Sequence, residues 1–261
     1  MRIIEAGLDT TGDDLIGTDL ITSGAVLWVD SENGNDSNSG SRELPLATLA
    51  AAITEATASN GDIIVIESGH SETLTSAITV SKAGLKIFGL GSGSEAPNFL
   101  SNAAIDLFDI TAANVELNNL YFLAATTATA TAQVNVAADS VRIKGCTFLC
   151  GAYTQNVVTV TASGTNCRIE SCAFTVTADG PDGGVLVESA SAVGLYLYDC
   201  TFDGGTYNWD NAAVYSTVAH TNFIYDTVTF SNNAKLIHTS SSAKGICSGL
   251  VVAAGGEVSL A

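Results

Sequence analysis

Five segments of the chain share one pattern, and this repetition constrains the fold more than any other feature. The segments are 115–122, 141–148, 167–174, 195–202 and 223–230, so their starts lie 26, 26, 28 and 28 residues apart. Positions 1, 3, 6 and 8 of each segment are apolar. One such unit cannot bury its own apolar face, so it must stack on its neighbours. Within each segment, apolar and polar residues alternate, and this alternation is broken once, between positions 3 and 6, which predicts two short strands joined by a bend. The whole pattern predicts an all-β parallel β-helix.

Strand-like segments at 63–66, 85–90 and 246–252 extend this register to about eight coils. Equivalent residues of successive coils should then stack in columns. One internal column is predicted to contain Phe122, Phe148, Phe174, Phe202 and Phe230, and a second Leu120, Cys146, Cys172, Cys200 and Val228. Two outward columns are predicted to contain Glu116, Arg142 and Arg168, and Asn118, Lys144, Glu170, Tyr198 and Asp226. Opposite charges on neighbouring strands would form an ion ladder.

The chain divides into an arm, residues 1–25, and a β-helix domain, residues 26–261, whose first part, 26–60, forms an N-terminal cap. The arm has five acidic residues and one basic residue, and its apolar residues form three short clusters. These are Ile3, Ile4, Leu15, Ile16, Leu20 and Ile21. Such a composition does not fold alone, so we expect these six residues to contact a neighbouring subunit or the surface of another partner. The alternative is that the arm runs along its own β-helix.

The net charge of −18 argues against direct binding to nucleic acid, which needs clustered Lys and Arg. We also expect no contact with membranes, because no apolar run is long enough to span a bilayer and no secretion signal is evident. The six cysteines lack the C-x-x-C spacing of zinc and redox sites. They are predicted to be free thiols, and the protein to fold in a reducing cytoplasm.

Residues 27–40, 45–53 and 61–66 resemble the N-terminal module of pectate-lyase-like right-handed β-helix proteins. There, a strand and a turn rich in Gly, Asn and Asp precede a short capping helix. Pro45 suits the first turn of this helix. Leu46, Leu49 and Ile53 would cover the open end of the coils. The stretch 30–36 is expected to be a turn, because it lacks the final glutamate of a calcium-binding loop.

Residues 61–123 resemble, more narrowly, β-helix proteins of tailed bacteriophages. This resemblance implies a virion protein on the capsid surface, namely a homotrimeric, non-enzymatic head decoration (cement) protein bound to the major capsid protein. It further implies that the protein folds in the host cytoplasm and that the partner of the six apolar arm residues is a neighbouring subunit or the capsid surface. The alternative is a tail-spike or tail-fibre protein that binds or cleaves host polysaccharide. A third possibility is a cellular lyase that acts on surface glycans.

No catalytic residue, metal or cofactor is predicted. Gly69-His70 and Arg142-Ile-Lys144 partly match polygalacturonase-type hydrolases, but they belong to distant coils. Asp199, Asp203, Asp210 and Asp226 are expected to cap turns. If the alternative function holds, the glycan patch would comprise Tyr196, Tyr198, Asp199 and Asp226, within a wider aromatic set that includes Tyr207, Trp209 and Tyr215. No role is assigned to His70, His220 or His238.

Overall fold

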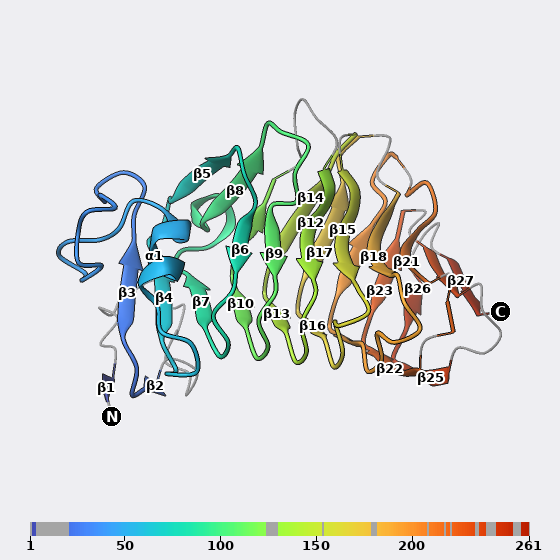
Figure 1. Ribbon diagram of the computed structural model, residues 1–261. Coiled ribbons are helices and arrows are strands. Elements are labelled where there is room, and N and C mark those ends of the chain that lie inside the picture. The colour runs from blue at the N-terminus through green and yellow to red at the C-terminus, as the bar shows by residue number, and fades with distance from the viewer. Residues whose placement is uncertain are drawn as a thin grey trace.

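The computed structural model describes residues 2–3, 21–123, 130–152, 154–178, 182–207, 209–216, 218–219, 221–232, 235–238, 244–252 and 257–260. Three parallel sheets wind into one solenoid, with the N-terminal cap at one end and the last strands at the other (Figure 1). This arrangement confirms the predicted all-β parallel β-helix.

Each coil contributes one strand to each sheet. Sheet 1 contains, in spatial order, β3 (Val26–Val29), β4 (Ile63–Ile66), β7 (Lys86–Gly89), β10 (Glu116–Asn118), β13 (Arg142–Lys144), β16 (Arg168–Glu170), β19 (Tyr196–Tyr198), β22 (Thr221–Asp226) and β25 (Lys244–Ser248). Sheet 2 contains β5 (Ser71–Leu74), β8 (Asn98–Ser101), β11 (Tyr121–Phe122), β14 (Thr147–Cys150), β17 (Ala173–Val176), β20 (Thr201–Asp203), β23 (Thr229–Ser231) and β26 (Val251–Val252). Sheet 3 contains β6 (Ile78–Val80), β9 (Phe108–Ile110), β12 (Ala130–Val136), β15 (Thr154–Val160), β18 (Gly183–Val187), β21 (Ala212–Ser216), β24 (Lys235–His238) and β27 (Glu257–Leu260).

The bend between sheet 1 and sheet 2 is a single residue in the left-handed conformation. It recurs at Asn119, Gly145, Ser171, Asp199, Thr227 and Gly249. Most of these residues donate their backbone N–H to a carbonyl of the next coil, as Gly145 does to Glu170 O at 2.9 Å. The two coils nearest the cap have longer connections, one of which contains a short 3₁₀ helix, η2 (Gly93–Glu95). The solenoid therefore has about six regular turns, slightly fewer than the eight coils predicted.

The interior consists of the predicted columns. The rings of Phe148 and Phe174 stack at 4.8 Å between centroids, and those of Phe174 and Phe202 at 4.5 Å. All five phenylalanines of this column are fully buried. The second column is buried as well, and its thiols point at backbone carbonyls, as Cys172 Sγ does toward Glu170 O at 3.3 Å. The stacking confirms that equivalent positions of successive repeats lie in register, one coil above the next.

All six cysteines are unpaired, as predicted, and all except Cys247 are buried. Burial raises the pKa of Cys167 to about 12 and the pKa values of Cys150 and Cys172 well above their usual range. A thiol must ionise to react. We therefore expect iodoacetamide at pH 8 to modify at most Cys247 in the native protein and all six cysteines in guanidinium chloride, as measured by intact mass. Rapid modification of several thiols under native conditions would contradict the buried column.

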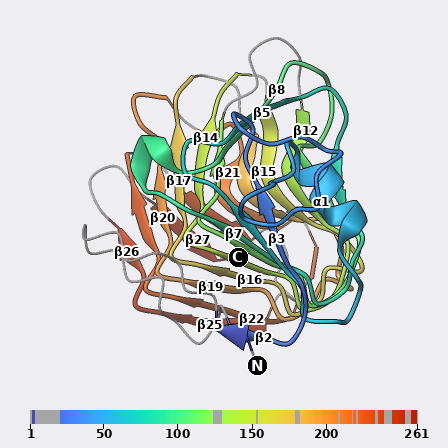
Figure 2. The same cartoon turned by 90° about the vertical axis from the view of Figure 1, so that its left-hand side faces the viewer.

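The N-terminal cap closes one end of the solenoid, which Figure 2 shows end on. Its helix, α1 (Leu49–Glu55), begins four residues after Pro45, so the prediction that Pro45 lies in the first helical turn is wrong. Thr48 is the N-cap and accepts a hydrogen bond from the Ala51 N–H, while Asp36 Oδ1 accepts hydrogen bonds from the N–H groups of Ala47 and Thr48. These polar contacts set the start of the helix.

The predicted covering of the core by the cap is confirmed, because Leu46, Leu49 and Ile53 are buried in the main core. Leu46, however, lies in extended chain and forms a bridge to Val29 rather than a helical turn. The predicted turn at 30–36 is also confirmed, since Asp30 Oδ1 accepts hydrogen bonds from the N–H groups of Glu32 and Asn33.

Only the two ends of the arm lie within the described residues. Strands β1 (Arg2–Ile3) and β2 (Ile21–Thr22) pair in antiparallel fashion, which brings Ile3 opposite Ile21. The other predicted contact residues of the arm, Ile4, Leu15, Ile16 and Leu20, lie outside the described residues. In the part of the chain that the structure describes, no helix has the length and apolarity to cross a membrane.

Candidate functional site

The outer face of sheet 1 carries the predicted ion ladder. The register places Glu116, Arg142 and Arg168 in one column, with Lys144 and Glu170 in the next. Arg142 Nη2 lies 2.6 Å from Glu170 Oε2, and Arg142 Nη1 lies 3.8 Å from Glu116 Oε2. Arg168 Nη1 lies 3.5 Å from Glu170 Oε1. The arginine and glutamate charges on this face largely neutralise one another, which supports a structural role for Arg142.

The four residues of the predicted glycan patch lie at the same end of sheet 1. Tyr196 and Tyr198 point outward from β19 with parallel rings 6.1 Å apart, and the Arg168 guanidinium lies 5.2 Å from the Tyr196 ring centroid. Asp226 neighbours Tyr198 in the register. Asp199 forms the bend at the end of β19, where its Oδ2 accepts a hydrogen bond from Ser171 Oγ at 3.0 Å. Asp199 thus has the predicted turn role, and the patch is a pair of tyrosines beside one carboxylate.

The residues of the wider aromatic set lie on different parts of the molecule. Tyr207 and Trp209 lie in the connection between β20 and β21, where Trp209 is buried, and Tyr215 lies on sheet 3. Asp203 has the predicted turn role, because its Oδ1 accepts hydrogen bonds from Gly205 N–H and Asn232 Nδ2. The single aromatic surface suggested by the sequence is therefore two separate surfaces.

The two segments that partly match polygalacturonases also lie far apart in the structure. His70 directly precedes β5, whereas Arg142 and Lys144 precede β14, three strand positions further along sheet 2. Three spacings of about 4.8 Å separate these coils by roughly 14 Å. The His70 ring is buried, with its Nδ1 accepting from the Ser31 N–H and its Nε2 2.9 Å from Glu72 Oε1. His220 lies outside the described residues, and only the backbone of His238 is described.

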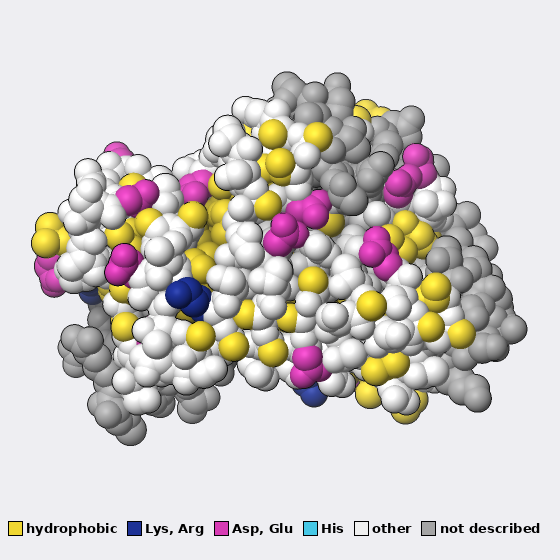
Figure 3. All heavy atoms as spheres, viewed as in Figure 1, with side chains coloured by type: hydrophobic (Ala, Val, Ile, Leu, Met, Phe, Trp, Pro, Cys, Tyr) yellow, Lys and Arg dark blue, Asp and Glu magenta, His cyan; other side chains and the backbone are white. Residues whose placement is uncertain are grey.

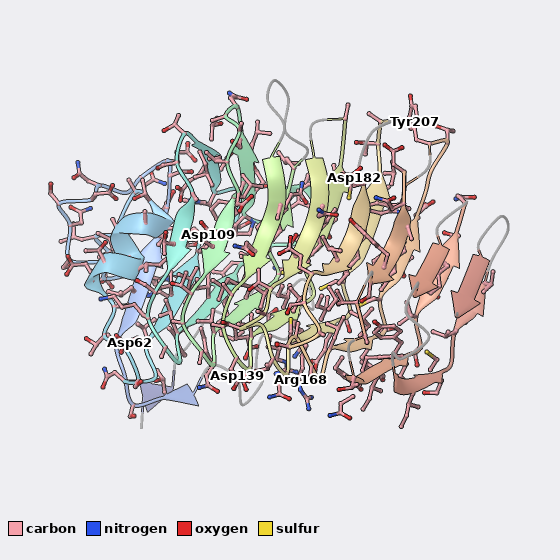
Figure 4. All side chains as sticks on the ribbon, turned by 45° about the vertical axis from the view of Figure 1, so that its right-hand side comes forward. Asp62, Asp109, Asp139, Arg168, Asp182 and Tyr207 are labelled. Atoms are coloured by element: carbon pink, nitrogen blue, oxygen red, sulfur yellow. The ribbon has the colours of Figure 1, made fainter. Side chains whose placement is uncertain are left out.

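A row of mostly polar residues runs along the outer face of sheet 3. Strand pairing aligns Thr79, Asp109, Asn135, Thr159, Leu186 and Tyr215 on consecutive strands. Their neighbours along each strand are mostly apolar residues that point into the core, so this row points outward. Acidic side chains are spread along this side of the molecule (Figure 3), and Asp109 and Asp182 lie on it (Figure 4). We call these six residues the sheet 3 row.

Tyr215 forms a flat platform at one end of the row. Its hydroxyl donates to Asn156 Oδ1 at 2.9 Å, across the intervening strand β18. The ring passes directly over Gly183 of β18, where any Cβ atom would overlap Tyr215 Cε1. Only glycine leaves room for the ring at this position. Tyr215 thus lies against the sheet backbone and is half-buried.

Carboxylates stand beside this platform. Burial and then the charge of Asp210 raise the pKa of Asp182. Burial likewise raises the pKa of Tyr215, to which the charge of Asp182 adds. These shifts place Asp182, Asp210 and Tyr215 in one electrostatic cluster. The cluster offers an aromatic face together with oxygen atoms that accept hydrogen bonds.

A second pair of carboxylates lies nearer the cap. The Asp106 Oδ1 atom accepts a hydrogen bond from the Ala132 N–H at 2.7 Å, and burial, reinforced by the charge of Asp109, raises the pKa of Asp106. Asn135 Nδ2 donates to Asp109 Oδ1 at 3.1 Å. Asn135 Oδ1 and the Thr159 hydroxyl, however, are buried without a hydrogen-bond partner in the described structure. An ordered water or the hydroxyl of a ligand would satisfy them.

Metal binding has no obvious centre in this arrangement. Among the residues that the structure describes, no three His, Cys, Asp or Glu side chains are grouped as they would be around a metal ion. The side chains of sheet 3 offer hydrogen bonding and aromatic stacking. The sequence analysis placed Tyr215 with Tyr196 and Tyr198 in one aromatic set, whereas the structure places it on another sheet. The alignment of Gly183 with Asn156 and Ala212 was the signal that it missed.

Comparison with known proteins supports the fold alone. No family model matches the sequence, and no curated protein matches it. Among solved structures, pectate lyase Pel9A superimposes with a TM-score of 0.58 at 14% identity, covering 93% of this chain and 80% of that one. A rhamnogalacturonan lyase gives 0.51 at 17% identity, and this chain covers 63% of its length while 91% of this chain is matched. A pectin methylesterase from Aspergillus niger gives 0.51 at 12% identity, with 92% and 91% covered. The chain thus has the architecture of pectate-lyase-like β-helix proteins.

Proposed function

We propose that the protein binds an extended polysaccharide along the outer face of sheet 3 without cleaving it, as a tail-spike or tail-fibre protein would. The Tyr215 platform carries this proposal. A flat, half-buried tyrosine offers an apolar face and a polar edge, and this one interacts with the charge of Asp182, which in turn interacts with that of Asp210. A sugar ring has the complementary surface, because its C–H groups stack on an aromatic face and its hydroxyls donate to carboxylates.

Two further observations support a glycan. The sheet 3 row adds hydrogen-bonding side chains on three consecutive strands, Asp109, Asn135 and Thr159, and two oxygen atoms there lack partners. Pectate and pectin, named in two of the similar structures, are polysaccharides. The resemblance of residues 61–123 to phage β-helix proteins favours a place on a virion. Head decoration, a homotrimer and contact with a major capsid protein remain predictions from that resemblance.

The test is glycan binding by matched variants. We expect the wild-type protein to bind at least one polysaccharide of a bacterial-surface panel, and Tyr215→Ala to weaken that binding about tenfold or more, which corresponds to ~1.4 kcal/mol. Gly183→Ala should weaken it too, because the added methyl group displaces the ring. Isothermal titration calorimetry would give the dissociation constants.

The control is Tyr198→Ala, which removes an aromatic side chain of the same size from sheet 1, where it is exposed. It should bind as the wild type does. Weakened binding in Tyr198→Ala with normal binding in Tyr215→Ala would instead support the patch of Tyr196, Tyr198, Asp199 and Asp226. New reducing ends or unsaturated products after incubation with the bound polysaccharide would contradict the non-enzymatic role.

A further inference from the structure

The sheet 3 row ends at a cavity beneath the cap. This cavity has a volume of about 420 Å³ and lies between α1 and the first strand of sheet 3, β6, with its flanking residues. It is lined by Ala50, Ile53, Thr54, Ala77, Thr79, Ser81 and Lys82. The space-filling view shows the surface hollowed between the cap and the solenoid (Figure 3). We call this cavity the cap pocket.

The cap pocket is continuous with the row, because Thr79 belongs to both. Five strand spacings of about 4.8 Å separate Thr79 from Tyr215, which gives a length of roughly 24 Å. Helix α1 forms the wall of the pocket on the side away from the row, through Ala50, Ile53 and Thr54. A polymer that lies along the row therefore meets α1 and cannot extend past it, so the pocket accepts the end of a chain.

The chemistry of the pocket differs from that of the row. The row carries the carboxylate of Asp109, whereas the pocket contains a lysine and three hydroxyls. Among the described residues, none forms an ion pair with the Lys82 ammonium. The Thr54 hydroxyl donates to Ala50 O at 3.0 Å, but those of Thr79 and Ser81 have no partner in the described part of the chain. A lysine with two free hydroxyl donors in a chain of net charge −18 favours a single anionic group.

We propose that the cap pocket binds the terminal sugar of the polysaccharide through an anionic substituent on that sugar. Lys82 forms the ion pair with the anion, Thr79 and Ser81 donate hydrogen bonds to it, and Ile53 and the alanines contact the sugar ring. This proposal rests on the glycan-binding function of sheet 3 and adds the charge and the orientation of the ligand. A carboxylate, a sulfate or a phosphate has the required chemistry.

The experiment uses single sugars, which are too short to reach the Tyr215 platform. Glucuronate, glucose 6-sulfate, glucose 6-phosphate and glucose would each be titrated into the full chain, with binding followed by ligand-observed NMR. We expect at least one anionic sugar to bind the wild type, glucose not to bind detectably, and Lys82→Gln to weaken anion binding about tenfold or more. Lys144→Gln removes the same charge from sheet 1 and should have no effect. Thermal melting of each variant would verify folding.

The possible outcomes separate this proposal from the proposed function. Equal binding of anionic and neutral sugars, or no loss in Lys82→Gln, overturns the pocket proposal. If polysaccharide binding still depends on Tyr215 in that case, the function of sheet 3 stands. If no polysaccharide binds but an anionic sugar binds through Lys82, sheet 3 is not a glycan surface and the pocket is a separate anion site.

Discussion

Phe174→Asp should yield no folded protein. The ring is fully buried in the middle of the phenylalanine column and stacks on both neighbours, at 4.8 and 4.5 Å. Removal of a buried phenylalanine side chain alone costs about 3–5 kcal/mol. A carboxylate at this position would also be buried among apolar side chains, which adds several kcal/mol or forces it to be protonated. Together these costs approach the whole free energy of unfolding of a typical domain, about 5–15 kcal/mol.

The measurement is soluble yield, followed by circular dichroism and thermal melting of any soluble product. Phe174→Leu is the matched control, because it keeps an apolar side chain in the column. We expect it to fold with a loss of roughly 1–3 kcal/mol. A soluble Phe174→Asp protein with the wild-type melting temperature would contradict the register that places Phe174 in the buried column.

The columns could be predicted because each repeat keeps the same number of residues between its paired apolar positions. The bend at Gly145 or Ser171 is one residue long in every regular turn. A segment such as 141–148 therefore fixes both strands around the bend at once. The two coils near the cap replace this bend with longer connections, which is why the count of coils from sequence was slightly too high.

Sheet 3 was harder to predict, because the connections from sheet 2 to sheet 3 vary in length from coil to coil. Position along the chain therefore does not show which residues align across its strands. The contact of Tyr215 with Asn156 skips one strand, and it exists because the intervening residue, Gly183, has no side chain. The start of α1 was predicted too early for a similar reason. Local preference favoured Pro45, whereas the backbone hydrogen bonds that distant Asp36 and the Thr48 side chain accept set the boundary.

His70 illustrates a residue whose role only the structure reveals, and its replacement should have the second large effect. The imidazole accepts from the Ser31 N–H at Nδ1, so its proton lies on Nε2, which donates to Glu72 Oε1 at 2.9 Å. The same Glu72 oxygen accepts from the Leu49 N–H, the first of α1, at 2.7 Å. One buried ring thus connects the loop after β3, the first coil and the helix of the cap.

His70→Ala should therefore loosen the cap rather than the solenoid. It leaves the Ser31 N–H without its acceptor, removes one donor from Glu72 and opens a cavity, a loss of about 3 kcal/mol. For a chain of this length that loss lowers the melting temperature by roughly 6–12 °C. Because the lost bonds all lie between the cap and the first coil, limited proteolysis should cut first within residues 26–60. Glu72→Gln keeps an oxygen that accepts both hydrogen bonds, so it should stay close to the wild type in both assays. Cleavage of His70→Ala that starts in the central coils would show that the cap is held by its apolar contacts, Leu46, Leu49 and Ile53, and not by this network.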